Sequence, residues 1–177
     1  ATSNLEPVAG DNFAYTASYT TVQWTGELSA RSIDLGSGVV NAAPIWSAQE
    51  KLDKKVGKGC DNRSIYLFRG AATNKLVDFK WNSQACDAAG APTGSAVTTL
   101  DSTEQGNFGS TKIQMLSQYS AMTDGSSGTV NQRTAAAGAN LVNYLRGQAG
   151  KEGFVTNDIE RLYRSREHTL GDIVNAQ

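Results

Sequence analysis

His168 is the only histidine among the 177 residues, so any chemistry that needs an imidazole depends on it. It ends a strongly polar run, Arg164-Ser-Arg-Glu-His168, and the chain has no Gly-x-Ser-x-Gly turn to expose a nucleophilic serine. The acids that glycoside chemistry would use are scattered and mostly stand beside turn residues. They are Glu27, Asp34, Asp78, Asp101, Glu104 and Asp124. We therefore expect no catalytic residue and no enzyme; a secreted enzyme with an unrecognised acid pair is the least favoured alternative.

Metal and phosphate sites are not predicted either. Two cysteines and one distant histidine cannot supply the four ligands of a structural zinc site. A calcium loop needs alternating oxygen ligands and a closing acid, whereas Asp124-Gly-Ser-Ser-Gly128 has one acid and is typical of an ordinary turn. Gly57-Lys-Gly59 lacks the spacing of a phosphate-binding loop. We expect no metal ion and no cofactor in this segment.

Cys60 and Cys86 are the only two cysteines. In an exported protein they would pair and close a loop of roughly 25 residues, which stabilises the fold by ~3 kcal/mol in the chain-entropy model. We favour this disulfide over the alternative of two free, buried thiols.

Two sets of side chains could form binding surfaces. Trp24, Trp46 and Trp81 could stack on sugars, but each lies in or beside an apolar run, which favours packing in a core or an interface. Arg164 and Arg166 alternate, so an extended chain would place both guanidinium groups on one side. There they could pair with carboxylates or carbonyls; simple exposure to solvent is the alternative.

Charge and hydropathy exclude two classes of partner. The 16 basic and 17 acidic residues nearly cancel, and no basic stripe suited to nucleic acid is present. No apolar run approaches the ~20 residues of a membrane span. The first residues lack the basic start and apolar centre of a signal peptide, so we expect either a removed signal or an internal fragment.

The first half of the chain is predicted to be mostly extended. Residues 13–23 alternate aromatic with small or polar side chains, which is typical of a strand. A second extended segment follows as far as Leu35, and Gly36-Ser-Gly38 indicates a turn. Ser47 is placed to cap a short helix over residues 48–52.

A second hairpin and one main helix are predicted further along. The segment Arg63–Arg69 is the clearest strand, and Leu76–Trp81 is its expected antiparallel partner. The helix runs over residues 132–146, and Gly147 is its expected stop. Its apolar face consists of Ala137, Leu141, Tyr144 and Leu145.

Residues 82–131 are rich in Ala, Gly, Ser and Thr, and we interpret them as a loop-like variable insertion. Within them, residues 112–122 show roughly helical spacing of apolar side chains. At the other end, Leu170-Gly-Asp-Ile-Val-Asn175 resembles the start of a buried strand. The prediction is an α+β fold, mostly antiparallel hairpins packed on one main helix near the C-terminus.

Four short motifs occur in an order that resembles the PilY1-like type IV pilus tip-associated proteins. Trp24-Thr-Gly-Glu-Leu-Ser-Ala30 and Ile45-Trp-Ser-Ala48 carry the first part of the resemblance, followed by Arg63-Ser-Ile-Tyr66. The last part is residues 140–175, with the helix, the Arg-x-Arg and Leu170-Gly-Asp-Ile-Val-Asn175. The resemblance does not extend to residues 82–131.

The resemblance implies that residues 1–177 form a single region preceding a C-terminal β-propeller, with 169–177 as the first propeller strand. The parent protein would be exported and carried at the pilus tip on the outer surface of a bacterium. There it would support pilus assembly and surface adhesion without catalysis. Calcium would belong to the missing propeller. The implied partners are the propeller itself, the minor pilins of the tip, and a host or abiotic surface.

We expect seven residues to dock this region onto the propeller, with the two arginines fixing the register. They are Trp24, Leu28, Leu141, Leu145, Arg164, Arg166 and Leu170. The alternative function is an independent extracellular carbohydrate-binding module that uses the tryptophans.

Overall fold

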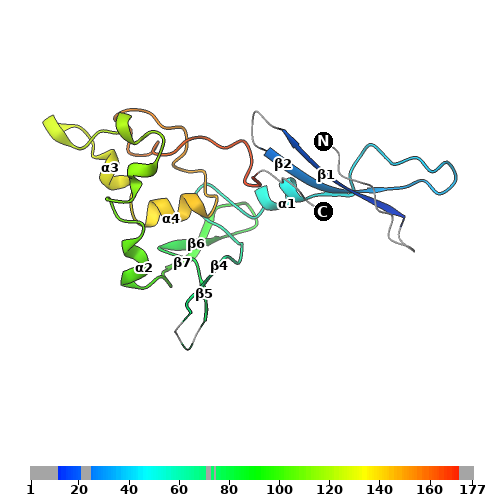
Figure 1. Cartoon of the computed structure of the whole chain (residues 1–177), viewed down its shortest axis with the longest axis horizontal. Coiled ribbons are helices and arrows are strands. Elements are labelled where there is room, and N and C mark those ends of the chain that lie inside the picture. The colour runs from blue at the N-terminus through cyan, green and yellow to red at the C-terminus, as the bar shows by residue number, and fades with distance from the viewer. Residues whose placement is uncertain (1–11, 21–24, 71–72, 74, 172–177) are drawn as a thin grey trace. The chain divides into compact units, whose positions relative to one another are not determined.

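The structure is a computed structural model that describes residues 12–20, 25–70, 73 and 75–171 (Figure 1). The chain forms two compact units. Unit 1 consists of the residues up to Lys54 together with those from Glu167 onward, and unit 2 is Lys55–Arg166. The hairpins are antiparallel and are combined with short helices, so the predicted α+β class is confirmed.

Unit 1 contains a three-stranded antiparallel sheet in the order β1-β2-β3. Its strands are β1 (Phe13–Thr20), β2 (Thr25–Ser32) and β3 (Trp46–Ser47), and the first two are the blue arrows of Figure 1. The alternating pattern thus predicted β1 correctly as far as residue 20; residues 21–23 lie outside the described part.

Helix α1 (Ala48–Asp53) follows the sheet of unit 1, and its predicted start is confirmed. The side chain of Ser47 accepts a hydrogen bond from the backbone N–H of Glu50, as an N-cap does. Glu27 on β2 adds a second restraint, because its carboxylate accepts hydrogen bonds from Ser47 Oγ and from the backbone N–H of Ala48. Sheet and helix are therefore joined at one point by a serine and a glutamate.

Unit 2 begins with two hairpins. The predicted antiparallel pairing of Arg63–Arg69 with Leu76–Trp81 is confirmed. The strands themselves are shorter than predicted and are β4 (Tyr66–Phe68) and β5 (Leu76–Asp78). The second hairpin joins β6 (Ser83–Cys86) to β7 (Pro92–Val97).

A disulfide between Cys60 and Cys86 ties the chain before β4 to the end of β6, which confirms the predicted pairing. The chain approaches this bridge closely at Gly57. A Cβ there would lie 2.5 Å from Gly90 O and 2.7 Å from Cys60 Sγ, so only glycine fits without a shift of the backbone.

The prediction that residues 82–131 are loop-like outside 112–122 is wrong, whereas their interpretation as a variable insertion stays a prediction. They contain the β6–β7 hairpin, helix α2 (Ser102–Gly106) and three 3-10 turns. These turns are η1 (Ile113–Met115), η2 (Tyr119–Ala121) and η3 (Ser126–Gly128). The helical spacing of 112–122 does not give one helix, because Leu116 has extended backbone angles (ψ 133°) and separates η1 from η2.

The predicted helix over 132–146 forms as two, α3 (Gln132–Ala135) and α4 (Ala139–Leu145). Gly138 separates them with φ 68° and ψ −135°, and its N–H donates to Phe108 O instead of continuing a helix. A Cβ at this position would lie 3.5 Å from the ring of Trp81. The helix is thus broken where an indole packs on the backbone. Gly147 ends α4 with φ 101°, as predicted.

The apolar core of unit 2 is built from the segment that looked like an insertion together with α4 and the segment after it. Its buried members are Ile113, Met122, Ala136, Leu141, Leu162 and Tyr163. In the described part of the chain, no helix is long and apolar enough to cross a membrane.

Candidate functional site

A buried ion pair holds α4 in place. Arg146, the residue after α4, is fully buried, and its guanidinium lies 2.8 Å from the equally buried carboxylate of Asp61. Its two terminal nitrogens also donate to Phe79 O at 2.6 Å and Arg63 O at 3.1 Å. Burial lowers the pKa of Arg146 and the charge of Asp61 opposes that shift; an arginine stays protonated in either case. The helix end is therefore fixed to both sides of the β4–β5 hairpin.

A second arginine is stacked beside α4. The Arg166 guanidinium lies 4.1 Å from the centre of the Tyr144 ring, and that ring is stacked on Tyr163 with 4.3 Å between centres. Arg166 also donates two hydrogen bonds to the carboxylate of Glu152. Its Nε donates to Oε1 at 2.7 Å and its backbone N–H donates to Oε2 at 2.8 Å. Cation, ring and carboxylate together fix the chain at Arg166.

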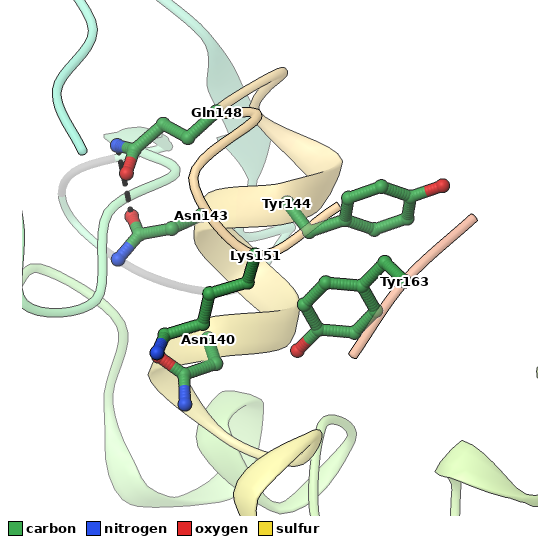
Figure 2. Close-up of a pocket in the computed structure, with 6 residues that line it drawn as sticks. All are labelled: Asn140, Asn143, Tyr144, Gln148, Lys151 and Tyr163. Carbon is green, nitrogen blue, oxygen red and sulfur yellow. Dashed lines mark hydrogen bonds between the residues drawn. The ribbon is translucent and has the colours of Figure 1, made fainter. Parts of the chain in front are cut away.

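Beside this stack lies a polar pocket of about 60 Å³ (Figure 2). It is lined by Asn140, Asn143, Tyr144, Gln148, Lys151 and Tyr163. Three of these residues come from one face of α4, at positions i, i+3 and i+4, and two come from the loop that follows the helix. Figure 2 shows the Gln148 amide turned toward Asn143 and the two tyrosine rings face to face.

Two of the lining side chains have structural roles. Asn143 accepts a hydrogen bond from Ser83 Oγ at 2.5 Å and donates to the backbone oxygens of Trp81 and Asn82, so it attaches α4 to the start of β6. The buried Tyr163 hydroxyl donates to Ala136 O at 2.9 Å. Burial raises the pKa of Tyr163, so the phenol stays protonated at any physiological pH.

Unit 1 carries an aromatic sheet face. Tyr15 and Trp46 both pair with Ala30, so the two aromatic side chains lie on the same face with ring centres 6.4 Å apart. Ala30 is buried at this position, while Tyr15 is 40% exposed. Lys51 Nζ lies 5.5 Å from the centre of the Trp46 ring. Leu28 shares this face, which is a half-open apolar surface.

His168 is paired with a carboxylate in unit 1. Its Nδ1 lies 2.7 Å from Asp53 Oδ2, and the backbone N–H of Thr169 donates to Asp53 Oδ1 at 3.0 Å. A shallow pocket beside them is also lined by Ser47, whose hydroxyl donates to Glu27. Within the described residues this serine has no hydrogen bond to His168. The contacts of Asp53 with His168 and Thr169 therefore hold residues 168–169 against α1.

The predicted docking residues belong to both units and differ in burial. Leu28 and Leu145 are exposed, as is Arg164, whose carbonyl accepts a hydrogen bond from the Tyr144 hydroxyl. Leu141 is 8% exposed and belongs to the core of unit 2. Leu170 is half-buried in an irregular segment.

Two predictions fall partly or wholly outside the described residues. Trp24 lies there, and so do residues 172–177 of the predicted first propeller strand. Across the described part of the chain, no group of three or more His, Cys, Asp or Glu side chains is placed to hold a metal ion.

The sequence did not point to the pocket residues Asn140, Asn143, Gln148 and Lys151. One signal was available, because two asparagines three residues apart on an otherwise apolar helix must share a polar stripe. The carboxylates Asp61 and Glu152 gave no local signal, since their arginine partners lie far away in the sequence.

Comparisons with protein-family models, with curated proteins and with solved structures find no match to this chain.

Proposed function

We propose that this chain is a non-enzymatic region of a type IV pilus tip-associated protein that supports pilus assembly and surface adhesion. It would act outside the cell, at the pilus tip, next to the propeller of its parent protein and the minor pilins. The proposal rests on the order of the four motifs and on the contacts that Arg166, in the last motif, makes in the structure.

The observation that carries it is the anchoring of Arg166. The resemblance assigns the Arg-x-Arg segment the role of setting register at the entry to the propeller. Such a role needs a chain whose position is fixed, and Arg166 is held by Glu152 and by the Tyr144 ring. Arg164, two residues earlier, is exposed and free to meet a second surface.

Two further observations support the proposal. A disulfide is compatible with an extracellular protein, because such bonds form and persist in oxidising compartments. Leu28 at 36% and Leu145 at 53% exposure present apolar surface that a docking partner can cover. Leu141 serves the same end indirectly, since it packs α4 into the core and so sets the position of Leu145.

The test is complementation in a piliated host that lacks its own tip protein. The parent gene would carry a deletion of residues 1–170, or Leu145→Glu combined with Arg164→Glu. The matched control is Met115→Glu, because Met115 is 93% exposed and lies outside all four motifs.

We expect the deletion and the double variant to lose surface pili or attachment, and the control to keep both. Lost pili would support a role in assembly, and normal pili that fail to attach would support the adhesive role. Normal pili and normal attachment from the deletion would overturn the proposal.

A further inference from the structure

Strand β1 forms one edge of the sheet in unit 1. It pairs with β2 along all of its eight residues, and the register is unbroken from one end to the other. Its sequence, Phe-Ala-Tyr-Thr-Ala-Ser-Tyr-Thr, contains no charged residue, no proline and no glycine. A long, regular strand edge with these properties is a template for pairing with another strand.

Every second residue of β1 directs its backbone groups toward this edge. The carbonyl oxygen of Ala30 on β2 accepts a hydrogen bond from the N–H of Ile45, so it points away from β1. Its partner Tyr15 therefore belongs to a non-hydrogen-bonded pair of the β1–β2 ladder, and its own N–H and C=O face outward. The alternation gives four such residues, which are Phe13, Tyr15, Ala17 and Tyr19. Among the described residues, no segment outside the sheet hydrogen-bonds to their backbone groups.

The strands of the two hairpins in unit 2 have features that oppose such pairing. Strands β4 and β5 are three residues long, and β5 ends in Asp78. Strand β6 accepts a hydrogen bond at Gln84 O from the backbone N–H of Asp61. Strand β7 begins with Pro92 and pairs with β6 through a register shift. Short strands, charges, prolines and irregular pairing are the usual protection of a sheet edge, and β1 has none of them.

The edge of β1 is complementary to itself. When two copies pair in antiparallel register centred on Thr16, Phe13 of each copy lies opposite Tyr19 of the other. Tyr15 then lies opposite Ala17, so every outward-facing residue enters a pair that exchanges two backbone hydrogen bonds. On the aromatic face a ring meets a ring and a large side chain meets a small one. On the other face threonine meets threonine at the centre, and no charge meets a like charge.

We propose that β1 pairs with β1 of a second copy of this chain, in the antiparallel register centred on Thr16. The two three-stranded sheets join into one sheet, and the aromatic face of Tyr15 and Trp46 continues across both copies. Each copy uses the same strand, so the assembly closes at two copies. The edge has no charge that would select a charged strand, whereas its own sequence matches it on both faces. The pairing is independent of the pilus role, because none of the docking residues proposed above lies in β1.

The association is measured by sedimentation velocity on the intact, oxidised chain. Pairing along one strand buries less than the ~800 Å² per partner of a standard interface, so we expect a dissociation constant of about 50 µM. A concentration series from about 5 to about 500 µM brackets this value and leaves about a fifth of the chains monomeric at its upper end. Hydrogen exchange at that concentration should slow about fivefold at Tyr15 and Ala17 relative to the dilute chain. The amides of Thr16 and Ser18, which face β2, should be protected at every concentration.

The decisive variant is Ala17→Pro, with Ala17→Val as its matched control. Proline removes an N–H that faces the free edge and leaves the β1–β2 ladder intact, so it should weaken the dimer at least about tenfold. Valine adds similar bulk and keeps the N–H, so it should leave the dimer unchanged. If the proline variant does not fold, Thr16→Cys replaces it. Two cysteines at the centre of the pair lie about 4.5 Å apart between Cα atoms, close enough for a disulfide between copies, whereas Ser18→Cys faces Ala14 and should form none.

Four results would overturn the proposal. The chain stays monomeric at the highest concentration. The dimer of Ala17→Pro is as strong as that of Ala17→Val, or Thr16→Cys links no more than Ser18→Cys. Protection on association appears at the β4 amides and not at Tyr15 and Ala17. Assemblies larger than two copies form, which contradicts a pairing that closes on itself.

Discussion

The two units bury different kinds of side chain. In unit 1 the buried apolar residues among those described are Ala14 and Ala30, with Ser29 beside them. Unit 2 buries larger groups, among them Ile113 and Tyr163. Unit 1 is thus organised by a ladder of backbone hydrogen bonds covered by aromatic rings, and unit 2 by a packed interior.

The units also differ in the kind of link that joins their segments. Unit 2 is held by a disulfide and two ion pairs whose members are largely buried, which are Cys60–Cys86, Asp61–Arg146 and Glu152–Arg166. In unit 1, β1 and β2 are sequential, Glu27 contacts α1 about twenty residues later, and the Asp53–His168 pair, with a sequence separation of 115, is partly exposed. The comparison teaches that a small unit with a modest core can gain definition from a few long-range covalent and charged links.

The most severe test of this comparison is Asp61→Ala. It leaves the buried Arg146 guanidinium without its counter-charge, which we expect to destabilise unit 2 by about 4 kcal/mol. Hydrogen exchange should show lost protection in α4 and β4–β5, while the β1–β2 amides keep theirs. Equal loss of protection in both units would show that unit 2 does not depend on this ion pair more than unit 1 does. Lys112→Ala, an exposed position of unit 2 whose side chain caps no helix, is the control.

The disulfide comes next in expected size. Replacing both cysteines, Cys60→Ser with Cys86→Ser, should lower the free energy of unfolding of unit 2 by about 3.5 kcal/mol, because the bond closes a loop with a sequence separation of 26. Denaturant unfolding of the oxidised, reduced and double-serine chains measures this. The reduced and double-serine forms should agree, and a midpoint that does not move in either would contradict the expectation.

A smaller effect is expected in unit 1 from Ser47→Ala. The change removes the N-cap of α1 and the hydroxyl that donates to Glu27, and such caps contribute about 1 kcal/mol. Faster hydrogen exchange at Glu50 would report it. Ser18→Ala, at an exposed position of β1, should leave that amide unchanged. If the α1 amides kept their exchange rates, the serine would not be the link between sheet and helix.

The smallest effect is a pH dependence confined to unit 1. Burial alone would raise the pKa of Asp53, but hydrogen bonds from Thr169 and His168 outweigh it and hold the pKa below 3.8. A lowered carboxyl pKa stabilises the fold above the ordinary value, and that stabilisation is lost as the pH falls through the lowered one. The amide signal of Thr169, which donates to this carboxylate, should therefore show its acidic titration step below about pH 4. In Asp53→Asn the same signal should show no such titration.

The sequence predicted those features that depend on interactions between residues close together in the chain. The alternation in β1, the Ser47 cap and the Gly147 stop depend on neighbouring residues, and all three appear in the structure. Helix α2 also carried such a signal, since Asp101 and Glu104 form a capping box, although the composition of the region obscured it.

The remainder depends on residues distant in sequence. Strand β7 reads Pro-Thr-Gly-Ser-Ala-Val and is exposed throughout, so no hydrophobic period marks it; it forms by pairing with β6. No residue near Arg146 in the sequence indicates that Asp61 is its partner. The pocket was unpredictable for the same reason, because Asn140 and Lys151 line one cavity only once the loop after α4 has folded back.

The covalent link between Cys60 and Cys86 has a mechanical consequence. When a chain is pulled from its ends, the residues inside a closed disulfide loop cannot extend, and a sequence separation of 26 corresponds to about 90 Å of hidden contour length. Strands β4 and β5 lie inside that loop, so tension would bypass them as long as the bond is oxidised. A reducing agent would release this length as one discrete step in a single-molecule stretching trace.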